Sequence, residues 1–117
     1  SGVRCATVLK DGLKRILNKS KNIPMVFFPI GGVGKSGGVM AYTIKKLMGR
    51  FSHVSWQFVD IDFKFKKIPY TIILLDDFIG SGKSTSDLYD SIYPKFPKGS
   101  KCYCLCNKVV VNWKITA

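Results

Sequence analysis

Hydrophobic residues recur along the chain with two different periods, which predicts alternating helices and strands. Residues 5–19 have the i, i+4, i+7, i+8 spacing of an amphipathic helix, with basic residues on its other faces and the apolar stripe formed by Leu9, Leu13, Ile16 and Leu17. The segment after Gly38 repeats this helical spacing with Met40, Ile44, Leu47 and Met48. Gly49 is the predicted end of that second helix.

Four apolar segments have the character of strands. Residues 25–30 form a short buried-type run, and Pro29 is expected at its end because proline cannot donate a ladder hydrogen bond. Residues 54–58 alternate between apolar and polar positions, whereas residues 70–75 are apolar on both faces, as central parallel strands are. Residues 101–111 supply the last strand.

The alternation changes phase near residues 59–60, which predicts a bulge or a turn there. Beyond it, the aromatic and aliphatic positions are expected to face one way and the charged positions the other, with Ile61, Phe63 and Phe65 opposite Asp62, Lys64 and Lys66. The simplest interpretation is that the aromatic side chains pack on the sheet and the lysines lie in water. Basic residues alternating with aromatic ones can also bind nucleic acid through phosphate contacts and base stacking.

A short helix carrying Leu88 and Ile92 precedes the last strand and is expected to end at Pro94. The resulting order of helices and strands predicts an α/β fold with three layers: a mostly parallel central sheet of about four to five strands with flanking helices. A chain of 117 residues fits one domain, residues 1–117. No apolar run is long enough to span a membrane and the N-terminus lacks the shape of a signal peptide, so we expect a cytoplasmic protein without a membrane partner.

Two glycine-rich segments follow apolar strands and precede helices, which is where open α/β sheets bind ligands. The first spans residues 31–38 (GGVGKSGG) and the second residues 80–84 (GSGKS). Backbone N–H groups in such loops, with a helix N-terminus behind them, form a cradle for phosphate. Two cradles predict one ligand with two separated phosphate groups, or two ligands.

A nucleoside triphosphatase loop is one hypothesis for these segments. Its pattern G-x-x-x-x-G-K-[ST] fails in both, because Pro29 and Asp77 stand where the first glycine is required. A carboxylate at that position repels a triphosphate unless a metal intervenes. A P-loop-like nucleoside triphosphatase therefore remains only as an alternative.

The second segment fits better when it is read from its strand. The run from Ile72 to Ser84 (IILLDDFIGSGKS) has four apolar residues, two acids, two more apolar residues and a loop of small residues. It resembles the phosphoribosyl-pyrophosphate signature of type I phosphoribosyltransferases. The resemblance implies that Asp76 and Asp77 bind the ribose hydroxyls and that the 5-phosphate is held by Gly80, Ser81, Gly82, Lys83, Ser84 and Thr85.

The first segment is similar to the pyrophosphate loop of the same family, in which a basic residue often precedes paired glycines. The resemblance implies pyrophosphate binding by Lys35, Ser36, Gly37 and Gly38. It also implies Mg²⁺ as a cofactor, bound with phosphoribosyl pyrophosphate and reached by Asp76 and Asp77 through the ligand. The two similarities cover residues 25–111.

Four departures separate the chain from the nucleotide-salvage enzymes of this family. Phe78, Gly80 and Lys83 replace more usual residues, and the G-S-G-K-S form is more similar to divergent domains of bacterial conflict and antiphage systems. The connection over residues 60–69 is short where the enzymes carry a long lid, no segment remains for the base-selecting hood, and the chain stops about one strand after the second loop.

These departures favour a binding or regulatory module for a phosphorylated ribose or nucleotide, whose catalysis is lost, altered or completed by a protein partner. An active phosphoribosyltransferase that releases pyrophosphate is the alternative, and the sequence assigns no catalytic residue. Its chemistry rests on charge neutralisation and positioning, so the missing general base does not exclude it.

The net charge keeps a third class of function open. The chain carries 19 Lys and Arg against seven acids, for a formal charge of +12. Such a surplus predicts anionic partners, including nucleic acid. Basic residues gather over residues 64–67 and 95–108, and Trp113 and Lys114 are candidates for a further interface.

The cysteines predict reduced thiols rather than disulfides. Cys102, Cys104 and Cys106 alternate along the last strand, so they share one face, where neighbouring positions are poorly placed for bonding to each other. Cys5 is isolated in the sequence. A zinc site is a weaker alternative because the spacing is unusual and the single histidine, His53, is remote.

Overall fold

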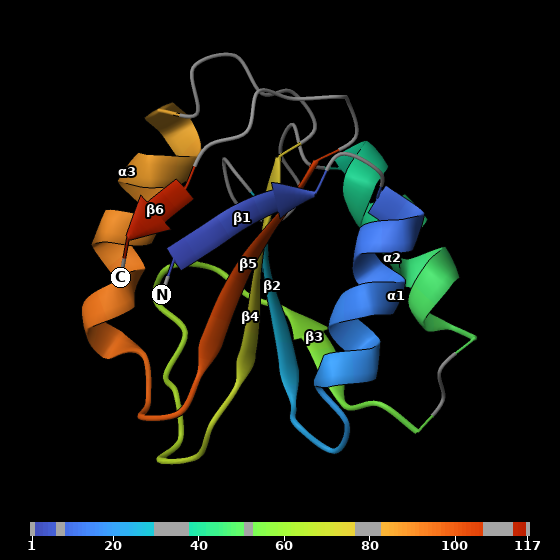
Figure 1. Cartoon of the computed structure of the whole chain (residues 1–117), viewed down its shortest axis with the longest axis horizontal. Helices are drawn as coiled ribbons and strands as arrows, with labels where there is room; N and C mark the ends of the chain where they lie inside the picture. Colours follow the sequence, from blue (N-terminus) through green and yellow to red (C-terminus); the bar gives the residue numbers. More distant parts are fainter. Residues whose placement is uncertain are drawn as a thin grey trace.

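A computed structural model describes residues 2–6, 9–29, 38–50, 53–76, 83–106 and 114–116, and the structural statements below concern these residues. Their elements, in chain order, are β1 (Gly2–Ala6), α1 (Leu9–Lys19), β2 (Met25–Pro29), α2 (Gly38–Met48), β3 (Trp56–Phe58), β4 (Thr71–Asp76), α3 (Lys83–Ile92), the short 3₁₀ helix η1 (Tyr93–Lys95), β5 (Lys101–Cys106) and β6 (Lys114–Thr116) (Figure 1). None of the described helices is long and apolar enough to cross a membrane.

The strands form one sheet in the order β3-β2-β4-β5-β1-β6. All neighbouring pairs from β3 to β1 are parallel, and only β6 runs antiparallel to its neighbour. The four strands that the sequence predicts, β2 to β5, lie side by side and are all parallel. The predicted α/β fold is therefore confirmed, with β1 and β6 added at one edge.

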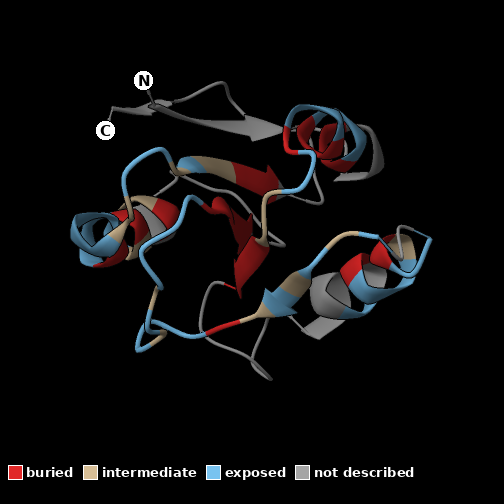
Figure 2. Ribbon diagram, turned by 90° about the horizontal axis from the view of Figure 1, so that it is seen from below, coloured by how far each residue is buried: buried red, intermediate tan, exposed pale blue. Residues whose placement is uncertain are grey.

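Alternate residues of the central strands belong to two separate clusters of the core, one on each face of the sheet. Met25 and Phe27 of β2 lie on one face with Ile73 and Leu75 of β4, where α1 and α2 cover them. The intervening residues face α3 on the other side, in a cluster formed by Val26, Phe28, Ile72, Leu74, Tyr89 and Ile92 with its neighbours. Figure 2 shows the buried strands between these helices. The three predicted layers follow from this period of two.

The helices use the apolar stripes that the sequence predicts. Leu13, Ile16 and Leu17 of α1 are buried, and so are Ile44 and Met48 of α2. Lys14, Arg15 and Lys19 are exposed as expected. The helix α2 ends at Met48, and the Gly49 N–H bonds to the Lys45 carbonyl, which confirms the predicted stop. The helix α3 also ends near its predicted terminator, since Pro94 lies inside η1.

The predicted start of the first helix is wrong. Residues 5–6 belong to β1, and α1 begins only at Leu9. The reason is tertiary pairing: β1 is hydrogen-bonded to β5 on one side and to β6 on the other, and this outweighs a weak helical pattern at the N-terminus. The strand β6 was not predicted at all. It contains Lys114, while Trp113 lies outside the described residues.

The change of phase near residues 59–60 corresponds to a turn at Ile61 and Asp62, where the Phe63 N–H bonds to the Asp60 carbonyl. Residues 63–70 do not continue as a strand, but Phe63, Phe65 and Tyr70 pack against the α3 face of the core. Lys64 and Lys66 are exposed. The inward aromatics are thus confirmed, whereas Ile61 is 57% exposed because it occupies the tip of the turn.

Candidate ligand-binding site

The two glycine-rich segments begin at the ends of neighbouring strands. The strands β2 and β4 pair in parallel, and Pro29 at the end of β2 is the partner of Leu75, one residue before the end of β4. Adjacent strands lie about 4.8 Å apart, so residues 30 and 77 follow strand ends that are side by side. Both strands are buried along their described side chains. A rigid part of the sheet therefore fixes where both segments start.

Each segment leads into the N-terminus of a helix. The first residue of α2 is Gly38 and the first residue of α3 is Lys83. Neither helix has an acid in its first turn, so no carboxylate there competes with a bound anion. Unpaired N–H groups and the helix dipole make such positions favourable for phosphate. The architecture is the one expected for two phosphate cradles at the carboxyl edge of the sheet.

The predicted site residues divide into two groups. Lys35, Ser36 and Gly37 lie outside the described residues, and so do Asp77, Gly80, Ser81 and Gly82. The described ones are Gly38, Asp76, Lys83, Ser84 and Thr85. Asp76 is the last residue of β4, in the middle of the sheet, and Lys83 and Ser84 open α3. Their assignment to ligand groups stays a prediction.

Thr85 differs from the other described candidates because its side chain is fully buried in the first turn of α3. It lies among the few buried polar side chains of the described chain, with Ser20 and Thr71. A buried threonine next to the second segment connects the helix start to the core. Its proposed contact with the 5-phosphate stays a prediction.

Register places a cysteine beside the candidate site, which the sequence pattern did not indicate. Cys106 is the partner of Asp76 across β4 and β5. On the other side of β5, Cys104 is the partner of Cys5 in β1, so the cysteine that is isolated in the sequence joins the others in the sheet. A parallel sheet brings such distant positions together, and only the strand order could have indicated it.

The described thiols have the character predicted for reduced structural cysteines. Neither Cys102 nor Cys104 is part of a disulfide, and Cys104 is completely buried. Burial raises the pKa of the Cys102 thiol far above its usual range. Burial also raises the pKa of the Tyr89 and Tyr103 hydroxyls. Within the described residues no group of three or more His, Cys, Asp or Glu is arranged to hold a metal ion.

Comparison with known proteins agrees with this architecture. The fold is that of a phosphoribosyltransferase-like α/β domain, with two loop-to-helix junctions at one edge of a parallel sheet. A family model described as PRTase-CE matches residues 5–112, so the chain belongs to this phosphoribosyltransferase-like family. No curated protein and no solved structure matches it significantly. The resemblance inferred from residues 25–111 is therefore confirmed at the level of the family.

Proposed function

We propose that this protein is a binding or regulatory module for a ligand that carries a ribose 5-phosphate and a second phosphate group, either phosphoribosyl pyrophosphate or a nucleotide. The observation that carries the proposal is the alignment of the ends of β2 and β4, which start both glycine-rich segments side by side. Membership of the PRTase-CE family supports the same ligand class.

Each glycine-rich segment is proposed to bind a different phosphate group of the ligand. Lys35, Ser36, Gly37 and the start of α2 at Gly38 would bind the pyrophosphate, whereas the segment from Gly80 to Thr85 would bind the 5-phosphate. Asp76 and Asp77 would accept hydrogen bonds from the ribose hydroxyls, which explains why two acids stand at the end of an otherwise apolar strand. Carboxylate and phosphate oxygens are also the ligands that Mg²⁺ prefers, so the donor set fits a magnesium ion bound through the ligand.

The region between β3 and β4 favours binding over efficient catalysis. In the enzymes that this chain resembles, a lid closes over the substrate from this connection. Here Phe65 packs against Phe28, Tyr70 and Phe96, with ring centroids 5.0–6.3 Å apart. A segment anchored in the core by its aromatic side chains is not available to close over a ligand. We therefore propose that catalysis is absent, altered or completed by a partner protein, as in a regulatory component of a bacterial conflict or antiphage system.

Calorimetry with phosphoribosyl pyrophosphate and Mg²⁺ tests the site. Asp77→Ala and Lys35→Ala are each expected to weaken binding tenfold or more, which corresponds to about 1.4 kcal/mol. Matched controls are Asp87→Ala on α3 and Lys14→Ala on α1, which remove the same charges from exposed positions. Unchanged affinity in both site variants would reject the assignment.

Release of pyrophosphate separates the module from an active transferase, the second candidate. The purified protein is incubated with phosphoribosyl pyrophosphate, Mg²⁺ and a panel of nucleobases. We expect binding without release. Release that requires one base and is abolished by Asp77→Ala would establish the enzyme instead.

A further inference from the structure

Exposed lysines precede three adjacent strands at the edge opposite the candidate site. Lys19 and Lys21 precede β2, Lys66 and Lys67 precede β4, and Lys98 precedes β5, which itself begins with Lys101. These strands are neighbours in the order β2-β4-β5 and are all parallel, so the segments that enter them share one edge of the sheet. We call these six exposed lysines the amino-edge lysines.

Hydrogen bonds hold the three entering segments together. The Thr71 N–H donates to the Pro24 carbonyl at 2.9 Å and joins the entry to β4 with that to β2. The Lys101 N–H donates to the Tyr70 carbonyl at 3.0 Å, and the Tyr70 N–H donates to the Ser100 hydroxyl at 2.9 Å, so the entry to β5 is joined as well. The lysines therefore lie on segments that hydrogen bonds connect to one another, rather than on independent loops.

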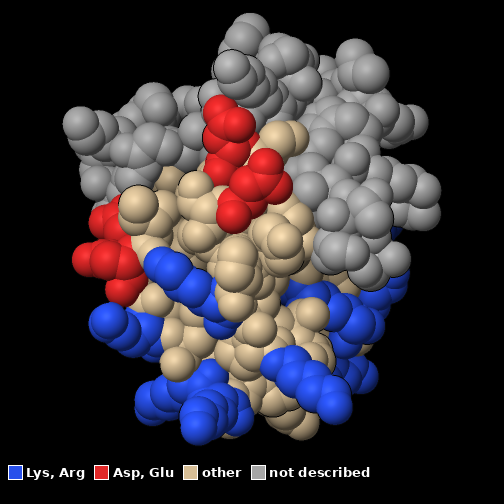
Figure 3. Space-filling view, turned by 90° about the vertical axis from the view of Figure 1, so that its left-hand side faces the viewer, with Lys and Arg blue, Asp and Glu red and all other residues tan. Residues whose placement is uncertain are grey.

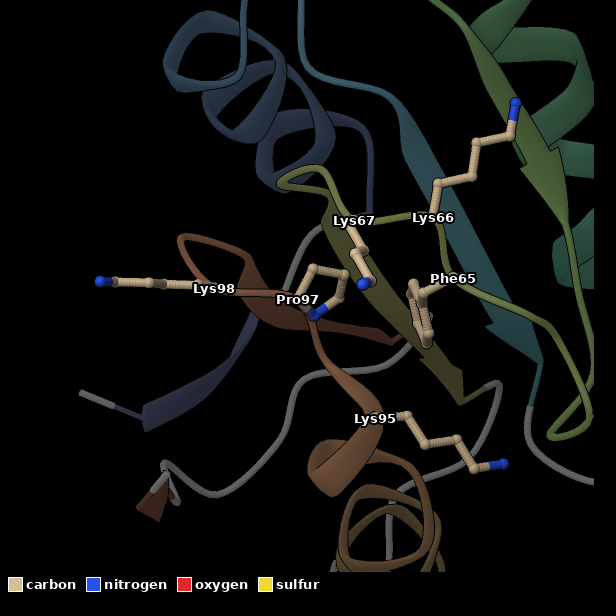
Figure 4. A pocket seen from close by; sticks show the side chains of 6 residues that line it. All are labelled: Phe65, Lys66, Lys67, Lys95, Pro97 and Lys98. Atoms are coloured by element: carbon tan, nitrogen blue, oxygen red, sulfur yellow. The ribbon is translucent and has the colours of Figure 1, made fainter.

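An open pocket of about 280 Å³ lies between two of these segments (Figure 4). Phe65 and Pro97 contribute apolar surface, and the rest of the lining is lysine: Lys66, Lys67, Lys95 and Lys98. The Lys95 ammonium is already used internally, since it donates to the Ile61 carbonyl at 2.7 Å. In Figure 4 the side chains of Lys66 and Lys98 extend away from the pocket in opposite directions. Their charges are therefore spread over a surface instead of converging on one small anion.

The charges on this side of the molecule are also segregated. Figure 3 shows Lys and Arg side chains around the lower part of the face, at the amino edge, with acidic side chains mostly above them and one acidic group at the left margin that borders the lysines. Charge segregated in this way attracts an extended anion and orients it along one edge.

We propose that the amino-edge lysines bind the phosphate backbone of a nucleic-acid duplex. The starts of β2, β4 and β5 span about 10 Å, two spacings between adjacent strands. Duplex DNA carries one charge per 1.7 Å of axis when both strands are counted, so this length carries about six phosphates, of which only a part faces the protein. Tyr70 is buried, and Phe63 and Phe65 are partly buried against the core, which leaves little of their ring surface for base stacking. Contacts to a duplex backbone, independent of base sequence, fit this surface better than binding of a single strand.

Fluorescence anisotropy with a 20-base-pair DNA duplex at 50 and 200 mM salt tests the proposal. The edge variant Lys67→Gln/Lys98→Gln removes one charge from each of two strand-entry segments. The control variant Lys14→Gln/Arg15→Gln removes two charges from exposed positions of α1, and each variant has a net charge of 12 − 2 = +10. We expect the edge variant to bind at least tenfold more weakly at 50 mM salt. Its slope of log K against log salt should be smaller by about 2, because about one counterion is released per phosphate contact.

The control variant should lose much less, and the single strand of the same length should not bind more tightly than the duplex. Equal losses in both variants would attribute binding to net charge and would overturn the proposal. Absence of duplex binding at 50 mM salt would overturn it as well. So would a result in which the wild type binds anionic lipid vesicles, the edge variant binds these vesicles more weakly, and the two proteins bind the duplex equally. The edge variant should retain wild-type affinity for phosphoribosyl pyrophosphate, so this proposal and the proposed function fail independently.

Discussion

Pro29 of β2 lies opposite Leu75 of β4 in the parallel register, and at the other end of the same pair Met25 lies opposite Thr71. The two central strands therefore begin together and end within one residue of each other. At about 3.3 Å per residue, their two ends are roughly 15 Å apart. The glycine-rich segments follow one end and the lysine-bearing segments precede the other. One rigid, buried pair of strands thus separates a proposed ligand site from a proposed nucleic-acid surface.

The hydroxyl of Tyr70 should contribute measurably to stability. It accepts a hydrogen bond from the Lys66 N–H at 3.0 Å, and the Tyr70 side chain is only 4% exposed. Tyr70→Phe leaves that backbone donor without this partner, so we expect the free energy of unfolding in urea to fall by about 1 kcal/mol. Tyr42→Phe is the matched control, because Tyr42 is 70% exposed, and it should change stability by less than about 0.5 kcal/mol. Equal effects would show that the hydrogen bond contributes nothing.

The two described turn glycines should respond differently to alanine. Gly99 has φ of +86°, and a Cβ there would lie 3.4 Å from the Pro69 side chain. Gly99→Ala should therefore destabilise the fold by about 1–2 kcal/mol, the cost of a left-handed backbone for an L residue. At Gly49 the nearest atom would be the Lys45 carbonyl oxygen at 3.4 Å and φ is not positive, so Gly49→Ala should be neutral or slightly stabilising. Thermal unfolding of both variants checks the difference, and a larger loss for Gly49→Ala would contradict it.

These results show which parts of the fold were predictable from sequence. The apolar stripe of α1 and the continuous apolar run of β4 both produced correct elements, because burial on one face or on both leaves a clear period. The strand β1 could not be predicted, since its five residues are fixed by pairing with β5 and β6 and not by their own pattern. The segment from Ile61 to Phe65 alternates like a strand, yet it has no regular secondary structure. Its aromatic side chains, Phe63 and Phe65, pack against the core.

The candidate site was more accessible to sequence analysis than the amino edge. Asp76 and Asp77 interrupt an apolar run next to glycines, a local signal that needs no knowledge of the fold. The sequence marks the basic stretches 64–67 and 95–108, but these and Lys21 are far apart in the chain. Only the strand order and the parallel pairing bring them to one edge. The sequence did contain an indication of this surface, because the amino-edge lysines stand before or at the start of apolar strands.

The Cys102 thiol should make stability fall at alkaline pH. Burial raises its pKa in the folded protein above the value of 9.0 for an ordinary thiol, so above about pH 9 the unfolded chain loses a proton that the folded protein keeps. The stability associated with the protonated thiol is complete below that pH and declines as the pH rises, by up to about 1.4 kcal/mol per pH unit. Urea titrations of the wild type between pH 8 and 10.5 measure this decline.

Cys102→Ala isolates the contribution of this thiol. Tyr89 and Tyr103 are present in both proteins, and burial is the largest cause of their raised pKa values. The Cys102 thiolate raises both pKa values further, so the variant removes this smaller effect together with the thiol. The variant should be less stable at pH 8 because it loses buried contacts, but its stability should fall less steeply above pH 9. Parallel curves for the two proteins would mean that the thiol ionises as readily in the folded state as in the unfolded one.

The most direct test of the central claim is competition calorimetry at the proposed ligand site. The claim is that the segments after β2 and β4 form one site for a ligand with two separated phosphate groups. Phosphoribosyl pyrophosphate with Mg²⁺ should bind with a stoichiometry of one per chain and should displace both ribose 5-phosphate and pyrophosphate. Failure to bind phosphoribosyl pyrophosphate, or displacement of neither fragment by it, would contradict the claim.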